Sequence, residues 1–250
     1  MNQNNEIVTA ALLVIGDEIL SGRTKDKNIG YIAEYLTTIG IDLKEVRVVP
    51  DEEAEIVDAL NAMRRRYTYV FTTGGIGPTH DDITADCVAK AFGVGIDHDP
   101  RAVAILKERL GARGIELNEA RLRMARIPKG AELVDNPVSG APGFWIGNVI
   151  VMAGVPTIMQ AMLDVAAPKL KTGTKMLSET VRADAREGDV GSALAEIAKA
   201  HPEVTIGSYP FFDDQKGPNT NIVVRGRDAS KLAAAKAAVE AMLVEVRATL

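Results

Sequence analysis

Three nearly continuous apolar segments constrain the fold of this chain more than any other feature of its sequence. They span residues 7–15, 69–73 and 148–153, and each is followed at once by a glycine. A segment without alternating polar residues predicts a strand that is buried on both faces, which is typical of a parallel sheet. A further strand is expected at residues 42–49, where Pro50 ends it.

Segments with apolar residues at helical spacing alternate with these strands. Helices are expected at residues 26–39, 52–65, 84–92, 101–112, 119–125 and 157–165. Such alternation predicts an α/β fold with a three-layer, doubly wound and mostly parallel sheet and right-handed crossovers. Ligands bind such sheets beyond the carboxyl ends of the strands, so the residues that follow each strand are the first candidates for a site.

The pattern changes near residues 171–174, where we expect a boundary between a first domain, residues 1–172, and a small α+β domain, residues 173–250. The small domain is expected to have the order β-α-β-β-α, with strands at 178–183, 204–209 and 220–225 and helices at 190–200 and 229–248. It shows no evident cluster of carboxylates or glycines, which favours a packing or dimerising role. Its alanine-rich stretch Leu232–Val244 is a candidate contact surface for a homo-oligomer.

The composition restricts the class of protein. The chain has 250 residues, of which 46% are apolar and 25% charged, and its formal net charge is −5. This balance excludes a disordered chain and argues against a broadly basic surface for nucleic acid. The single cysteine, Cys87, excludes a disulfide framework and a multi-cysteine zinc site, and its apolar neighbours predict a place in the core.

The first six residues contain no basic segment ahead of an apolar one, so the N-terminus does not resemble a signal peptide. The apolar run at residues 10–15 is far shorter than the roughly 20 residues that a membrane-spanning helix needs. We therefore expect a cytoplasmic protein with no membrane partner and no nucleic-acid partner.

The stretch from Thr73 to Thr84 is the most informative motif, and it reads TGGIGPTHDDIT. Its three glycines leave backbone N–H groups open to an anion, and the N-terminus of the next helix adds to that attraction. The alternative is a tight strand-to-helix turn that needs glycine for steric reasons alone. The motif lacks the Lys-Ser/Thr of a Walker A loop, and His80 stands where a dinucleotide fingerprint needs its third glycine.

Two carboxylates are candidate metal ligands and catalytic groups. Asp51 follows the strand at residues 42–49 and Asp82 follows the glycines, so a parallel sheet would bring both to one crevice. They would repel a phosphate there unless a divalent cation such as Mg²⁺ lay between them. For Asp51, capping of the helix that starts at Glu52 is an equally supported alternative.

Other polar residues show weaker patterns, and no Ser-His-Asp or Cys-His set is readable. His80 is a candidate ligand or acid–base group beside Asp81 and Asp82, with an ordinary loop residue as the alternative. Five arginines lie in the following stretch: Arg109, Arg113, Arg121, Arg123 and Arg126. We expect them to form a solvated helix face; the alternative is that one or two reach a substrate phosphate.

Four groups of residues are specific when taken as a set. They are Gly16-Asp17-Glu18-Ile19-Leu20 with Gly22, Asp26 and Asn28; the glycine motif; Pro128-Lys129-Gly130-Ala131; and Asn136-Pro137-Val138 with Ala141-Pro142-Gly143-Phe144. Over residues 7–170 this set resembles the molybdopterin-binding domain of the competence/damage-inducible CinA family, within the MoaB/Mog-like superfamily. The stretch Ile206-Gly207-Ser208-Tyr209-Pro210 resembles the small domain that follows in CinA-like proteins.

The resemblance implies a phosphate-bearing ligand, a divalent metal and a fold shared with molybdopterin adenylyltransferases and molybdenum-insertion proteins. Adenylyltransferases have one aspartate after the second strand and one after the glycine loop, so it implies that Asp51 and Asp82 are the catalytic, metal-binding pair. It also implies a set of ligand-binding residues: Glu18, Asn28, Thr73, Gly74, Gly75, Gly77, Thr84, Gly143 and Gly154.

For function, the resemblance implies a nucleotide pyrophosphatase that acts on ADP-ribose-like diphosphates. The alternatives are a non-catalytic module that binds molybdopterin or a nucleotide and, ranked lower, adenylyl transfer to molybdopterin. The nicotinamide-nucleotide amidase domain of full-length CinA proteins is expected to be absent. Gly154-Val155-Pro156 and Ile158-Met159 replace the Gly-Pro-Pro and Glu-Met of CinA proteins, as in stand-alone relatives and the N-terminal domain of eukaryotic FAD synthases, and Met124 replaces a frequent Gln.

Overall fold

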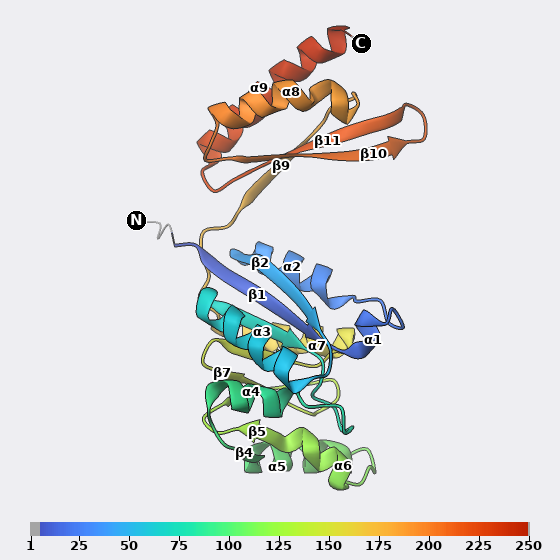
Figure 1. The fold of residues 1–250 in the computed structure, drawn as a ribbon, viewed down its shortest axis with the longest axis vertical. Helices are drawn as coiled ribbons and strands as arrows, with labels where there is room; N and C mark the ends of the chain where they lie inside the picture. Colours follow the sequence, from blue (N-terminus) through green and yellow to red (C-terminus); the bar gives the residue numbers. More distant parts are fainter. Residues whose placement is uncertain (1–5, 250) are drawn as a thin grey trace. The chain divides into compact units, whose positions relative to one another are not determined.

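A computed structural model of the chain describes residues 6–249 and shows two compact units (Figure 1). The first unit ends at Gly173 and the second begins at Thr174. Residues 1–5, which belong to the N-terminal stretch compared above with signal peptides, lie outside the described residues. Within residues 6–249, no helix combines the length and the apolar character that crossing a membrane requires.

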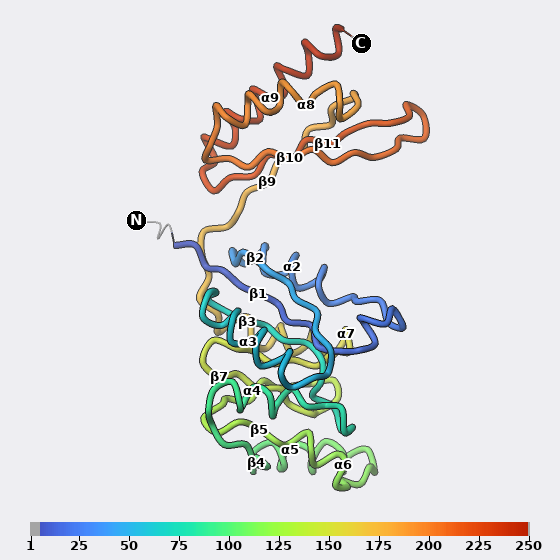
Figure 2. The backbone as a smooth tube through the Cα atoms, viewed as in Figure 1, coloured from blue at the N-terminus to red at the C-terminus, as the bar shows by residue number. Residues whose placement is uncertain are grey.

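A six-stranded sheet in the order β2-β1-β3-β8-β7-β6 forms the centre of the first unit. Its strands are β1 (Val8–Ile15), β2 (Ile41–Val49), β3 (Tyr69–Thr73), β6 (Glu132–Val134), β7 (Gly143–Ile146) and β8 (Val149–Met152). The neighbours β2, β1, β3 and β8 are parallel, whereas β7 and β6 are added antiparallel. Because parallel strands end on the same side, the loops after β1, β2, β3 and β8 gather there (Figure 2).

Four helices cover the two faces of this sheet, α3 (Glu53–Arg66) and α4 (Thr84–Phe92) on one and α2 (Asn28–Thr38) and α7 (Pro156–Ala166) on the other (Figure 1). The first unit also contains α1 (Asp17–Leu20), which follows β1, and α5 (Pro100–Gly111) and α6 (Glu119–Leu122), which lie near the strands β4 (Ile96–His98) and β5 (Arg126–Pro128). Successive residues of β1 point to opposite faces: Leu13 packs in the layer of α3 and α4, and Leu12 packs in the layer of α2 and α7. The expected three-layer, mostly parallel fold is therefore confirmed, and Cys87 is buried in its core.

The middle of the first unit differs from the expectation. Four short strands were missed, namely β4 (Ile96–His98), β5 (Arg126–Pro128), β6 and β7. They are three or four residues long, which is too short for a period of apolar residues to be recognised. A single helix over residues 119–125 is wrong, because α6 ends at Leu122 and Arg123–Ala125 form a 3₁₀ turn; a second such turn spans Ala167–Lys169.

The second unit has the order β-α-β-β-α. Its elements are β9 (Leu177–Arg182), α8 (Glu187–Ala200), β10 (Thr205–Asp213), β11 (Gly217–Gly226) and α9 (Ala229–Thr249). The antiparallel sheet β10-β11-β9 packs against α8 and α9 through a core that contains Leu194, Val224 and Val239. The contribution of α9 to a homo-oligomer stays a prediction.

Two carboxylates of this unit that no sequence pattern linked share one arginine in the fold. Asp184 and Asp213 both bind Arg182, at 2.8 and 2.6 Å. The two carboxylates are distant in sequence and meet because the hairpin formed by β10 and β11 pairs with β9. That pairing exists only in the folded sheet, so no local sequence motif could predict that these two carboxylates meet.

Candidate active site

The loop after β3 approaches the loop after β1 closely, and two glycines permit that approach. Gly74 has a φ of 101°, and a side chain there would collide with the main-chain oxygen of Ile15. Gly75 has a φ of 65°, and a side chain there would collide with the hydroxyl of Thr84. That hydroxyl donates to the oxygen of Gly74 at 3.0 Å. The turn therefore needs these glycines for steric reasons, and they also leave bare backbone beside a cleft.

Asp82 closes the same loop from its other end. Its Oδ2 atom accepts hydrogen bonds from the backbone N–H and the hydroxyl of Thr79, at 2.8 and 2.6 Å. The carboxylate lies directly on Gly77, where a Cβ atom would come within 2.6 Å of Oδ2. Gly77 thus allows a charged group to lie flat against the backbone of the loop.

A cleft of about 500 Å³ lies beside this loop. Carboxylates of Glu18 and Asp82 line it, together with the glycines that follow β3 and β8. Its apolar wall includes Ile76, Met124 and Val155. A cleft that combines bare backbone, carboxylates and apolar side chains suits a ligand with a phosphate, a bound cation and a flat ring.

Asp51, at the end of β2, belongs to an acidic group beside the cleft. Its Oδ2 accepts the backbone N–H of Asp17 at 3.0 Å, so its side chain caps α1. The interpretation of Asp51 as the cap of its own following helix is wrong, because Glu52 is the N-cap residue of α3 and no side chain caps that helix. Burial raises the pKa of Asp51, and the carboxylates of Asp17, Glu18 and Asp81 raise it further, although the Asp17 N–H lowers it. A bound cation would relieve this repulsion.

These residues fit a divalent cation that is shared with a ligand. Mg²⁺ commonly takes one or two carboxylates and completes its coordination with phosphate oxygens and water. Glu18 and Asp82 line one cleft, and Asp51 lies near Glu18 without lining it. In the described part of the chain, no three or more His, Cys, Asp or Glu side chains are grouped as a metal site. A cation here would therefore depend on phosphate oxygens of the ligand.

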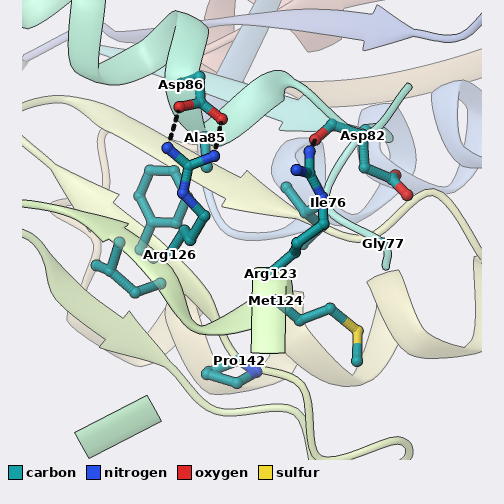
Figure 3. Close-up of a pocket in the computed structure, with 12 residues that line it drawn as sticks. Ile76, Gly77, Asp82, Ala85, Asp86, Arg123, Met124, Arg126 and Pro142 are labelled. Carbon is teal, nitrogen blue, oxygen red and sulfur yellow. Dashed lines mark hydrogen bonds and ion pairs between the residues drawn. The ribbon is translucent and has the colours of Figure 1, made fainter. Parts of the chain in front are cut away.

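Two arginines lie behind the loop, at a small cavity of about 20 Å³ that Gly77 and Asp82 also line (Figure 3). Arg126 binds Asp86 through two hydrogen bonds of 2.9 and 2.6 Å. Arg123 donates one long hydrogen bond, 3.4 Å, to the main-chain oxygen of Asp82. The Nε atom of Arg123 is buried and has no hydrogen-bond partner.

Comparison with known proteins assigns the first unit. The family model described as "Probable molybdopterin binding domain" matches residues 11–172. A CinA-like protein of Myxococcus xanthus is 31% identical over 92% of this chain, which spans 57% of that protein's length. The crystal structure of CinA, of unknown function, from Thermoplasma acidophilum has a TM-score of 0.60 and 34% identity, and covers 65% of this chain and 98% of that one. This chain is a CinA-like member of the molybdopterin-binding-domain family.

The second unit also matches a family model, described as the middle domain of FAD synthase, over residues 175–248. A protein of Aeropyrum pernix is 32% identical over 95% of this chain and 92% of its own length. A protein of Caldivirga maquilingensis is 38% identical over 83% of this chain and 82% of its own length. The alignment with the Aeropyrum pernix protein spans both units, so this CinA-like chain and that relative are similar in sequence over both.

The cleft of the CinA-like unit brings together six residues that the sequence nominated: Glu18, Gly74, Gly75, Gly77, Asp82 and Gly154. Three further nominated residues, Asn28, Thr73 and Thr84, are buried and do not line the cleft. Asn28 supports it, because its Nδ2 donates to the oxygen of Gly154 at 2.8 Å. Gly143 lies apart, within β7 and against β8 and α7. The binding role of each residue stays a prediction.

The other candidate residues also include some that lie close to the glycine motif and some that do not. His80 is exposed on the glycine loop and does not line the cleft. Arg109, Arg113 and Arg121 donate to main-chain oxygens away from the loop. Only Arg123 and Arg126 of the five arginines come close to the glycine motif.

Sequence reasoning missed how one wall of the cleft is built. Asn136 is buried, and its Nδ2 donates to the hydroxyl of Ser139 and the oxygen of Ala141. Its Oδ1 accepts the backbone N–H groups of Val138 and Ser139. This residue therefore holds the turn that contributes Ser139 and Ala141 to the cleft. The signal was present, since Asn before Pro favours a side-chain-closed turn.

Proposed function

We propose that this protein is a metal-dependent nucleotide pyrophosphatase that hydrolyses ADP-ribose-like diphosphates. The observation that carries the proposal is the presence, in one cleft, of the glycine loop and the carboxylates of Glu18 and Asp82. Bare backbone N–H groups favour a phosphate, and carboxylates beside them favour a cation that accompanies it. The backbone N–H groups alone would not favour a cation, and the carboxylates alone would not favour a phosphate.

The chain's own residues divide the reaction between them. The backbone N–H groups from Gly75 to Gly77 hold a phosphate, since that of Gly74 already donates to the oxygen of Met152. Glu18 and Asp82 would hold a divalent cation, which would polarise a phosphoryl oxygen. Asp51 belongs to the acidic group beside Glu18, and we assign it the role of accepting the proton of the attacking water. Water adds to one phosphorus, the P–O–P bridge breaks, and ADP-ribose yields AMP and ribose 5-phosphate.

The apolar wall supports a nucleoside as the other part of the substrate. Ile76, Met124, Val155 and Ile158 line the cleft beside the polar groups. Val155 is 54% exposed and is therefore open to contact with a ligand in the cleft. A flat ring placed on this wall would bury apolar surface and orient the diphosphate towards the loop.

One observation favours a second candidate, a non-catalytic module that binds molybdopterin or a nucleotide. Oδ2 of Asp82 already accepts two hydrogen bonds from Thr79, which is also what a purely structural carboxylate would do. Under this second function, Asp82 shapes the loop, and the cleft binds its ligand without turnover.

Turnover distinguishes the two candidates. The protein is incubated with ADP-ribose, FAD, NAD or ATP, each with Mg²⁺, Mn²⁺ or Co²⁺, and the products are separated by chromatography. We expect AMP from ADP-ribose, and a loss of about 100-fold or more in Asp82→Asn, the size of effect seen when one electrostatic catalytic group is removed. Asp97→Asn, at a residue whose side chain is 83% exposed, is the control. Binding without a product for every substrate and metal would favour the second candidate.

A further inference from the structure

The two arginines behind the glycine loop differ in charge balance (Figure 3). Arg126 is neutralised by Asp86, with both carboxylate oxygens engaged. Arg123 forms no ion pair within residues 6–249, and its guanidinium reaches only the uncharged main-chain oxygen of Asp82. Of two neighbouring arginines, Arg126 therefore has its charge balanced by a carboxylate and Arg123 does not.

The state of Arg123 is costly without a ligand. A guanidinium stays protonated in proteins, so it cannot reduce the cost by losing a proton. The Arg123 side chain as a whole is partly buried, but its Nε atom is fully buried and lacks a hydrogen-bond partner, so this N–H has lost the solvation it had in water. An anion that bound beside Arg123 would remove both deficits at once, because a guanidinium binds phosphate oxygens through two parallel N–H groups.

The position of Arg123 places it next to the cleft. The next residue along the chain, Met124, lines the cleft itself. Ile76, Gly77 and Asp82 line both the cleft and the small cavity that holds Arg123. The single hydrogen bond of 3.4 Å is easily exchanged for a stronger one, whereas Arg126 is held by two short bonds.

We propose that Arg123 binds the phosphates of the ligand and sets the preference of this site for diphosphates. One phosphate at the glycine loop uses the backbone N–H groups, and the second charge of a diphosphate is balanced by the guanidinium of Arg123. Because Arg123 balances this second charge, the carboxylates of Glu18 and Asp82 repel the diphosphate less. This inference rests on the proposed function only in placing a phosphate at the loop, and it does not require hydrolysis.

Binding of inorganic pyrophosphate, measured by calorimetry on the full chain with and without Mg²⁺, tests the inference. We expect Arg123→Gln to weaken pyrophosphate binding by about 10- to 100-fold, the effect of removing a charge-assisted hydrogen bond. Arg123→Lys keeps the charge without the fork and is expected to lie between the two. The control is Arg121→Gln, whose guanidinium binds the main-chain oxygen of Glu116 away from the loop; its affinity should stay within about twofold, as for a surface substitution.

Two further measurements keep the test decisive. The dependence of pyrophosphate affinity on salt should be shallower in Arg123→Gln, because one charge no longer contributes. In Arg123→Ala, added guanidinium ion should restore part of the affinity, which a purely structural role of the side chain would not allow. Equal affinity of Arg123→Gln and the unaltered chain, or no pyrophosphate binding by the unaltered chain, overturns the inference.

The outcomes separate this inference from the proposed activity. Pyrophosphate binding that depends on Arg123, with no hydrolysis of any diphosphate, would contradict the pyrophosphatase and support the role of Arg123. Hydrolysis of ADP-ribose that is unchanged in Arg123→Gln, with unchanged pyrophosphate affinity, would do the reverse.

Discussion

Each unit holds a cluster of charged side chains. The cluster of the second unit is paired, whereas the one around the glycine loop of the first unit pairs Arg126 with Asp86 but leaves Arg123 without a carboxylate. In the second unit, Arg182 binds Asp184 and Asp213, and Lys216 and Asn219 add hydrogen bonds to Asp184. The hydrogen bond from Arg182 is the largest cause that lowers the pKa of each carboxyl, and both fall to about 2. Opposite charges meet throughout this cluster, which ties the hairpin of β10 and β11 to β9.

Around the glycine loop of the first unit, polar groups of several kinds lack partners. Arg123 has no carboxylate, and burial together with neighbouring carboxylates raises the pKa of Asp51. Oδ1 of Asn28 is buried and accepts no hydrogen bond. A cluster whose charges are all satisfied stabilises a fold, whereas one with unsatisfied groups of both signs is arranged for something that binds. The contrast therefore supports the proposed site in the first unit.

Crowding the glycine loop should produce the largest effect. Gly75→Ala combines a φ of 65° with a collision at Thr84, whereas Gly93→Ala, at the end of α4, has a φ of 66° and no atom within 4 Å. We expect Gly93→Ala to lower the free energy of unfolding by about 1 kcal/mol, from backbone strain alone. Gly75→Ala should cost about 3 kcal/mol and abolish pyrophosphate binding, since the loop must move. Denaturant titration and calorimetry measure both; equal losses would show that the loop has room to spare.

Unpairing the second cluster should have a smaller effect. Arg182→Gln leaves Asp184 and Asp213 without their shared cation and removes the guanidinium from above the ring of Phe211, 5.3 Å away. We expect a small loss of stability, because the groups are exposed to solvent, and faster amide hydrogen exchange in β9, β10 and β11. Arg225→Gln, at an exposed residue of β11, is the control. Pyrophosphate affinity should not change, and a fall in it would contradict the division of roles between the units.

The sequence predicted the backbone that carries the site better than the pairing of its side chains. The apolar segments at β1, β3 and β8 predicted their strands, because a strand that is buried on both faces has apolar residues at successive positions. The glycine loop and Asp82 followed, since parallel strands end on one side of a sheet. The strands β4 to β7 were missed because each has only three or four residues.

The sequence contains no comparable pattern from which the partner of each polar side chain could be predicted. Arg123 and Arg126 are neighbours of one chemical type, and only the position of Asp86 in the fold distinguishes them. Asp51 resembled a helix cap because it precedes a helix, yet its carboxylate reaches the start of α1 instead. Such choices depend on which segments the folded sheet places side by side, which local patterns do not report.

The smallest effect gives the sharpest comparison, because its sign should differ between the two clusters. The carboxyl of Asp184 has a pKa of about 2 in the fold and an ordinary value of 3.8, so its stabilisation is present above pH 3.8 and is lost as the pH falls towards 2. The pKa of Asp51 is raised, so its charge costs stability at neutral pH, and that cost disappears as the pH falls through the raised value.

Asp184→Asn should therefore lower the unfolding temperature at pH 7 and flatten its decline below pH 4, and asparagine also tolerates the φ of 47° found there. Asp51→Asn should raise the unfolding temperature at pH 7 and change it little in acid. Thermal unfolding of both variants between pH 2 and pH 7 measures these opposite trends. A fall in the unfolding temperature of Asp51→Asn at pH 7 would mean that the hydrogen bond from Asp17 outweighs the repulsion. The acidic group beside the cleft would then be a structural cluster like that of the second unit.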